Sequence, residues 1–230
     1  MKDLPYIKSN YDELKEELAA IAERLGVKAP TLVAVTKSGT DEELCELMRS
    51  GAVCIGENRP QELRRRADLL YGEGFSPLMH QIGTLQRNKV KMIIKDVALI
   101  HSLDSLRLAD EIEKQAAAAQ RRVPVLIEVN SASEESKSGV SADEVERLLC
   151  DVSEHKHIEV CGLMTMGPAD ATEEELRGYF RSTKRLFDEL HSRYGFGAEP
   201  ILSMGMSDSY RIAIEEGSTL VRVGRRLFRK

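Results

Sequence analysis

The sequence predicts an α/β protein in which residues 1–230 form a single closed (β/α)8 TIM barrel. Eight short apolar runs, mostly β-branched and uninterrupted, recur along the chain, as is typical of parallel strands buried on both faces. Amphipathic stretches separate these runs, and no low-complexity linker or fixed-period repeat divides them. This alternation favours a barrel over its alternative, an open doubly wound sheet.

The apolar runs give the expected strands in chain order. They cover residues 31–36, 52–56, 78–83, 98–102, 123–130, 158–165, 200–204 and 219–224. In a barrel the functional site is built at the carboxyl ends of the strands, so the polar residues at these ends are the first candidates for a site. Polarity at a strand end is weak evidence alone, because any strand end meets water.

Helix signals fill the intervals between the strands. Capping-box patterns begin at Thr40, Ser141 and Thr172, and amphipathic segments cover residues 61–70 and 104–120. A further helix is expected over residues 6–25. The last strand ends near the end of the sequence, so we expect this N-terminal helix to pack outside the barrel in place of a long eighth helix.

Composition excludes several classes of protein. The 33 Lys and Arg residues against 38 Asp and Glu residues give a net charge of −5, which offers no general attraction to nucleic acid or to an anionic membrane. The charged N-terminus does not resemble a signal peptide, and no apolar run is long enough for a membrane span. Four scattered cysteines lack metal-ligand spacing. We therefore expect a reduced, cytoplasmic protein without a metal site.

One alternative is a phosphate- or nucleic-acid-binding barrel, prompted by residues 64–66 (RRR) and the basic ending 226–230. The three arginines lie between Glu62 and Asp68 on an expected helix, so a solvated, salt-bridged helix face explains them better.

Lys37 carries more information than the other strand ends, because it follows a wholly apolar strand. A lysine at the rim of a desolvated pocket can present a neutral amine to an aldehyde. The alternative is a lysine that extends from the barrel rim into solvent.

A second set of candidate site residues lies at the ends of the last two expected strands. Residues 202–207 (LSMGMS) are followed after a short interval by Arg222 and Gly224. Glycines let backbone amides approach a ligand, and Ser207 is expected to cap a short helix over residues 208–216 whose amides would favour a phosphate. The alternative is a capped helix with no ligand. Together with Lys37 these residues suggest pyridoxal 5′-phosphate (PLP), with Arg222 placed to tune the pyridine nitrogen.

Seven motifs then resemble the YggS/PROSC family of PLP homeostasis proteins, in order and over nearly the whole chain. They are residues 34–37 (AVTK), 56–58 (GEN), 80–89 (HQIGTLQRNK), 136–139 (SKSG), 162–166 (GLMTM), 202–207 (LSMGMS) and 221–224 (VRVG). The resemblance implies the alanine racemase type of barrel (PLP fold type III) without the C-terminal β-domain.

The resemblance also assigns residues. It implies that Lys37 holds PLP as a Schiff base, and that Ser207, Arg222 and Gly224 surround the cofactor, largely at its phosphate. The role of Arg222, at the phosphate or the pyridine nitrogen, therefore stays open. Three further motif positions are expected to line the pocket, namely Asn58, His80 and Met204.

The chain departs from the family pattern at two positions. Arg59 replaces the usual aromatic residue after GEN, and Arg225 replaces the usual small hydroxyl residue after VRVG. Arg225 either adds a charge to the phosphate site or points to solvent.

A racemase of the related fold needs a second base, a tyrosine from its β-rich domain, and this chain ends soon after the eighth strand. None of the six tyrosines falls at an expected strand end. We therefore expect a monomeric PLP carrier in vitamin B6 homeostasis that buffers PLP or delivers it to apo PLP-dependent enzymes. Lys137 is a second candidate amine, with a solvated loop lysine as its alternative. The alternative function is a PLP-dependent amino-acid racemase or other low-activity PLP enzyme.

Overall fold

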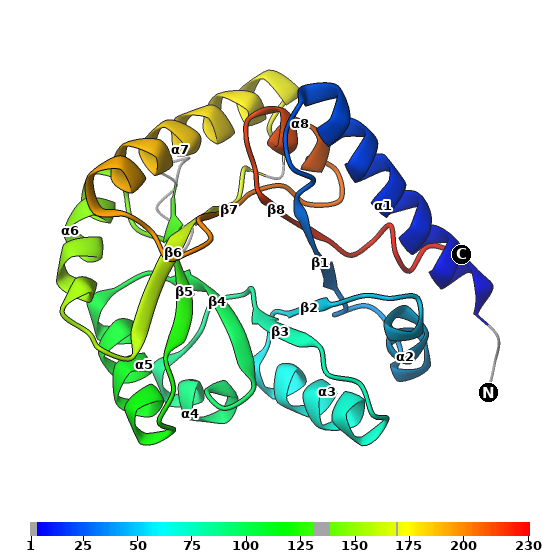
Figure 1. The fold of residues 1–230 in the computed structure, drawn as a ribbon, viewed down its shortest axis with the longest axis horizontal. Helices are drawn as coiled ribbons and strands as arrows, with labels where there is room; N and C mark the ends of the chain where they lie inside the picture. The colour runs from blue at the N-terminus through cyan, green and yellow to red at the C-terminus, as the bar shows by residue number, and fades with distance from the viewer. Residues whose placement is uncertain (1–3, 131–138, 169) are drawn as a thin grey trace.

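The computed structural model describes residues 4–130, 139–168 and 170–230, and these form a closed parallel barrel (Figure 1). Its strands are β1 Thr31–Val35, β2 Cys54–Glu57, β3 Leu78–Gln81, β4 Val97–Leu103, β5 Val123–Val129, β6 Ile158–Thr165, β7 Ile201–Ser203 and β8 Leu220–Val223. Each strand pairs in parallel with its sequence neighbour, and β1 also pairs with β8, from Thr31 opposite Leu220 to Ala34 opposite Val223. This closure confirms the predicted barrel and rules out the open sheet.

The helices lie outside the strands. They are α1 Pro5–Leu25, α2 Asp41–Arg49, α3 Pro60–Gly72, α4 Val90–Ile93, α5 Leu106–Ala118, α6 Ala142–Ser153, α7 Glu173–Tyr194 and α8 Tyr210–Glu215, with a 3-10 turn, η1 Arg87–Lys89, before α4. Helix α1 contacts both α2 and α8, so it covers the wall where β8 meets β1 (Figure 1). No helix within the described ranges is long and apolar enough to cross a membrane.

The predicted capping boxes begin α2, α6 and α7. The Thr40 hydroxyl accepts the Glu43 amide at 3.2 Å while the Glu43 carboxylate accepts the Thr40 amide at 2.7 Å. Thr172 and Glu175 repeat this exchange at 3.3 and 2.8 Å. Each exchange satisfies amides that the first turn of a helix leaves unpaired.

The prediction for α8 was wrong in one respect. The helix begins at Tyr210 and its N-cap is Ser209, not Ser207. Residues 207–209 form a turn, in which the Ser209 hydroxyl accepts the Met206 amide at 3.1 Å. The Ser207 hydroxyl instead accepts a hydrogen bond from the amide of Gly224, directly after β8.

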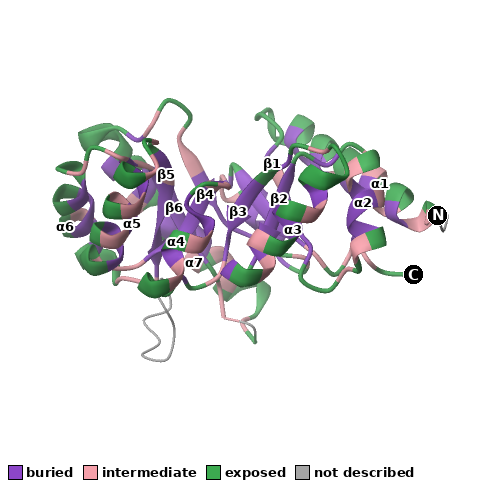
Figure 2. Cartoon of the chain, turned by 90° about the horizontal axis from the view of Figure 1, so that it is seen from below, coloured by how far each residue is buried: buried purple, intermediate pink, exposed green. Residues whose placement is uncertain are grey.

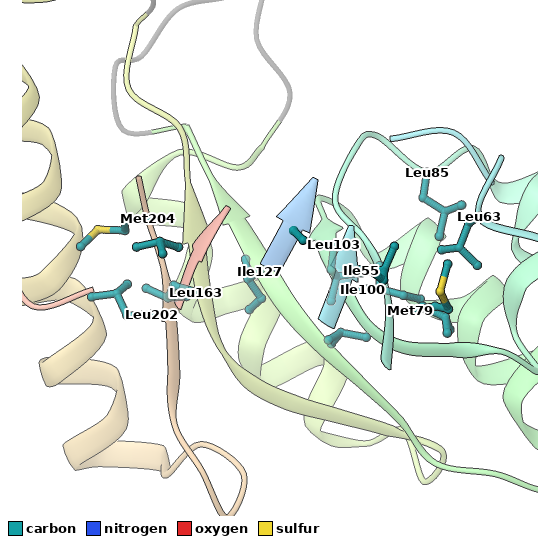
Figure 3. Close-up of a cluster of buried hydrophobic side chains, with 14 of the residues drawn as sticks. Ile55, Leu63, Met79, Leu85, Ile100, Leu103, Ile127, Leu163, Leu202 and Met204 are labelled. Carbon is teal, nitrogen blue, oxygen red and sulfur yellow. The ribbon is translucent and has the colours of Figure 1, made fainter. Parts of the chain in front are cut away.

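Alternate residues along each strand divide the core into two layers. The barrel interior holds a small cluster that includes Val33, Cys54 and Leu126. The residues next to them in sequence, such as Ile55 and Ile127, join the larger cluster between strands and helices, part of which Figure 3 shows. The strands are buried on both sides (Figure 2). This explains why their sequences are continuous apolar runs and do not alternate with polar residues.

Candidate functional site

A cavity of about 890 Å³ opens where the carboxyl ends of the strands meet. Its lining comes from the segments after β1, β2, β3, β6, β7 and β8, and its volume lies within the range of about 300–1,000 Å³ typical of small-molecule sites. Six of the eight predicted site residues line it: Lys37, Asn58, Ser207, Arg222, Gly224 and Arg225.

Lys37 lies in a tight turn directly after β1. The Gly39 amide donates to the Thr36 carbonyl at 2.9 Å, which closes the turn with Lys37 and Ser38 at its centre. The Lys37 side chain is exposed, so the desolvated rim that the sequence suggested is not observed. Its amine has no hydrogen-bond or ion-pair partner within residues 4–130, 139–168 and 170–230. Among these residues, no polar group competes for the Lys37 amine at the cavity wall.

The loop after β7 and the end of β8 are held together beside this turn. The Gly224 amide donates to the Ser207 hydroxyl at 3.3 Å, and the Arg222 amide donates to the Gly205 carbonyl at 3.1 Å. An added Cβ at Gly224 would lie 2.8 Å from the Val35 carbonyl oxygen, so only glycine allows β8 to approach β1 so closely here. These contacts place a hydroxyl and the loop backbone on one side of the cavity.

Arg225 pairs with Asp208 at the cavity. Both side chains are exposed, and both residues line the cavity. The Arg225 side chain thus reaches toward the loop after β7.

Arg222 supplies a buried positive charge at the cavity. It is 3% exposed, and its guanidinium donates to the Ser203 carbonyl at 3.0 Å, to the Ser203 hydroxyl and to the Thr165 carbonyl at 3.1 Å. Burial lowers the pKa of Arg222 to about 10, although the nearby Glu128 carboxylate acts to raise it. The side chain therefore remains a cation at neutral pH.

His80 and Met204 do not line the cavity. His80 is 5% exposed and Met204 is fully buried. His80 Nδ1 lies 2.9 Å from His101 Nε2, and His101 Nδ1 lies 3.1 Å from the Ser203 hydroxyl that also contacts Arg222. Burial lowers the pKa of His80 to about 4 and that of His101 well below its usual value. Both imidazoles are therefore neutral at pH 7 and support Arg222 through Ser203.

Several lining residues escaped the sequence reasoning. They include Ile82, Thr84, Pro168, Leu176 and Asp208. Leu176 follows the capping box expected at Thr172, and Asp208 was expected only as a residue of a short helix. A neighbouring cavity of about 340 Å³ shares Asn58 and Thr84 with the main one and carries Arg59 and Lys89. Lys137 lies outside the described residues.

The three arginines of α3 and the four cysteines test two further expectations. Arg64 and Arg65 form exposed ion pairs with Asp68 and Asp41, as predicted for a solvated helix face. Arg66 is 4% exposed, so the prediction was wrong for this residue. All four cysteines are free thiols, and no cluster of metal-ligating side chains occurs in the part of the chain that the structure describes.

The closed barrel and its cavity place the chain in a class of known proteins. A family model described as alanine racemase, N-terminal domain, matches residues 9–229. The barrel of alanine racemase from Corynebacterium glutamicum superposes with a TM-score of 0.74 at 20% identity, over 98% of this chain and 61% of that one. The fold is therefore the racemase-type barrel.

More similar proteins define the family within this class. The pyridoxal phosphate homeostasis protein of Aquifex aeolicus is 40% identical over 222 residues, covering 93% of this chain and 96% of the relative. The protein of the same name from Escherichia coli K12 is 32% identical over 229 residues, covering 96% and 95%. The chain belongs to the family of pyridoxal phosphate homeostasis proteins.

Two solved structures agree with this assignment. An unknown protein from Bifidobacterium adolescentis superposes with a TM-score of 0.89 at 34% identity, over 97% of this chain and 95% of that one. PipY of Synechococcus elongatus, in a structure with PLP bound, superposes with a TM-score of 0.85 at 26% identity, over 97% of this chain and 100% of that one.

Proposed function

We propose that this chain binds PLP, holds it through a Schiff base on Lys37, and acts in cytoplasmic PLP homeostasis by buffering the cofactor or delivering it to other proteins. The observation that carries the proposal is the free Lys37 amine at a cavity that also contains the Arg222 cation. The relatives named for PLP homeostasis and the PLP-bound PipY structure support the same function.

The residues at the cavity fit this cofactor. PLP supplies an aldehyde that a lysine amine attacks and a dianionic phosphate that cations and backbone amides favour. Lys37 provides the amine. We place the phosphate near Ser207 and Gly224, where a hydroxyl and the loop backbone meet and where Arg225 also lines the cavity. Asn58 contributes from the segment after β2.

Arg222 acts on the cofactor through its charge. Hydrogen bonds to Ser203 and Thr165 fix the position of its guanidinium. A fixed cation disfavours protonation of a nearby pyridine nitrogen and attracts an anionic group. His80 and Met204 act behind the cavity wall, His80 through His101 and Ser203.

We also propose a carrier and not a catalyst. Racemisation needs acid–base groups on both faces of the substrate carbon, and no tyrosine or histidine occurs among the described residues that line the cavity. The second candidate is a PLP-dependent racemase of low activity. Racemisation of alanine or serine by the purified protein, abolished in Lys37→Ala, would favour that candidate.

The primary test is spectroscopic. The protein is incubated with PLP, its visible absorbance is recorded, and the product is reduced with borohydride and mapped by mass spectrometry. We expect a band that is trapped on Lys37 and lost in Lys37→Ala. Lys89→Ala is the matched control, because Lys89 is a partly exposed lysine of the neighbouring cavity. A chain that gives no band with excess PLP, or traps it on Lys89, refutes the proposal.

A further inference from the structure

A buried ion pair lies against the turn that carries Lys37. Arg66 in α3 and Glu57 at the end of β2 approach to 3.0 Å between Nη1 and Oε1, and their side chains are 5% and 1% exposed. Buried charges are costly unless they are paired and hydrogen-bonded. The remaining hydrogen bonds of this pair therefore indicate what the pair holds in place.

Those hydrogen bonds all reach the Lys37 turn. Arg66 Nη1 donates to the Thr36 carbonyl at 2.5 Å and Nη2 donates to the Gly39 carbonyl at 2.9 Å. The Glu57 carboxylate accepts the Thr36 hydroxyl. One planar guanidinium thus spans both ends of a four-residue turn whose two central residues include Lys37.

The position of the Lys37 amine depends on this turn. The side chain is exposed and has no polar partner in the described ranges, so only its backbone directs it toward the cavity. Besides the closing bond from Gly39, the Thr36 amide donates to the Gly56 carbonyl at 3.2 Å. Arg66 is the side chain that ties the far end of the turn, at Gly39, to β2 and α3.

We propose that Arg66, oriented by Glu57, is a positioning residue that holds the Lys37 turn so that the Lys37 amine meets its aldehyde partner in the cavity. This inference rests on the proposed function for its chemistry. The geometry of the turn itself does not depend on that function. A lysine at position 66 would keep the charge but could not span two carbonyl groups as a planar guanidinium does.

A test of this role has to separate the charge of Arg66, which balances that of Glu57, from its two-point contact with the Lys37 turn. Burial raises the pKa of Glu57, while the Thr36 hydroxyl and Arg66 act to lower it. Removal of Arg66 alone would therefore favour protonation of Glu57 and change two groups at once. The double variant Glu57→Gln with Arg66→Gln removes both charges and the two-point contact together. Arg66→Lys keeps the charge and removes only the two-point contact.

The experiment compares these two variants with Arg65→Gln, a control on the same helix that pairs with Asp41 at the surface. Stopped-flow absorbance gives the rate of covalent attachment of PLP. Binding of 4-deoxypyridoxine 5′-phosphate, which lacks the aldehyde, reports the cavity without Lys37 chemistry. Hydrogen exchange of the Gly39 amide reports the turn without any ligand, with the amides of β1 as the internal reference.

We expect both Arg66 variants to slow attachment by about tenfold or more, since small misplacement of a reacting group costs up to about 100-fold in rate. Affinity for the aldehyde-free analogue should stay within about twofold, because its contacts lie elsewhere. Gly39 exchange should accelerate by about tenfold while the β1 amides are unchanged. Arg65→Gln should match the wild type.

Three outcomes would overturn the inference. Wild-type attachment rates in the double variant would show that charge balance alone matters. Equal losses of attachment and analogue affinity would show a general structural role. Unchanged Gly39 exchange in both variants would show that the turn is held without Arg66. If the wild type attaches no PLP, the proposed function fails, and the exchange measurement still decides whether Arg66 holds the turn.

Discussion

The carboxylate of Glu17 fastens helix α1 to the closing end of the barrel. Its Oε1 accepts hydrogen bonds from the Tyr210 hydroxyl at 2.7 Å and from Arg211 Nε at 2.5 Å, and its Oε2 accepts Arg226 Nη1 at 2.5 Å. Tyr210 and Arg211 begin α8, and Arg226 follows β8. We therefore expect Glu17→Gln to destabilise the fold at neutral pH.

The size of the effect follows from the pKa of Glu17. Burial acts to raise this pKa, but hydrogen bonds from Arg211, Tyr210 and Arg226 outweigh burial and lower it from 4.5 to about 2. Such a lowering sets a ceiling of about 3 kcal/mol on the stabilisation, at about 1.4 kcal/mol per pKa unit. The side chain is 24% exposed, so solvent screens part of the interaction. We expect a loss of about 1–2 kcal/mol.

The pH dependence gives the sharper test. Because the folded pKa is lowered, the stabilisation is complete above about pH 4.5 and is lost as the pH falls through about 2. Urea unfolding of wild type and Glu17→Gln at pH 7 and pH 3 should show a gap at pH 3 less than half of that at pH 7. The exposed neighbour Glu16→Gln is the control. A gap that is independent of pH, or equal in both variants, would refute the reasoning.

Three further predictions concern other parts of the barrel. Gly205→Ala should cost about 2–3 kcal/mol in urea unfolding, because Gly205 has a φ of 89° and an added Cβ would lie 2.6 Å from the Ala213 Cβ; a loss below about 0.5 kcal/mol would contradict this. The His80 and His101 rings should show no NMR titration between pH 5 and 8, and the stability they contribute should fall as the pH drops from 6.5 toward 4, since burial lowers both pKa values; a titration midpoint near 6.5 for either ring would be inconsistent with their burial. Cys150 should be the one thiol that reacts rapidly with Ellman's reagent in the native protein, because the other three cysteines are buried; rapid reaction of a second thiol would show that the barrel opens.

The sequence predicted the barrel because its strands carry a signal that does not depend on distant residues. Burial on both faces makes each strand a continuous apolar run, and every strand boundary lies within two residues of the expected one. The capping boxes of α2 and α7 are equally local, since their hydrogen bonds join residues three apart. The predicted start of α8 was wrong because residues 207–209 are Ser, Asp and Ser, and each of these residue types is favourable at an N-cap.

The site was predictable to the extent that it lies at strand ends. Lys37, Asn58 and Arg222 line the cavity because parallel strands bring their carboxyl ends to one face of a barrel. His80 is at a strand end as well, yet its side chain turns into the barrel interior, where His101 receives it. Position along a strand therefore predicts at which end of the barrel a residue lies. It does not predict whether the side chain points into the cavity or into the barrel interior.

The burial of Arg66 follows from the pattern of apolar residues in α3. The buried residues of α3 recur at Pro60, Leu63, Ala67 and Leu70, and Arg66 lies on the same stripe, three residues after Leu63. The two arginines before it point elsewhere because successive residues are about 100° apart around a helix. A charge on an apolar stripe requires a buried partner of opposite sign, and Glu57 follows an apolar strand just before this helix.

What the sequence cannot supply is the position of the Thr36–Gly39 turn, some 30 residues earlier in the chain, because only closure of β1 against β2 brings its carbonyl groups to the Arg66 guanidinium. The lysine and the residues that orient it thus belong to different βα units, and the site exists only once those units have packed together.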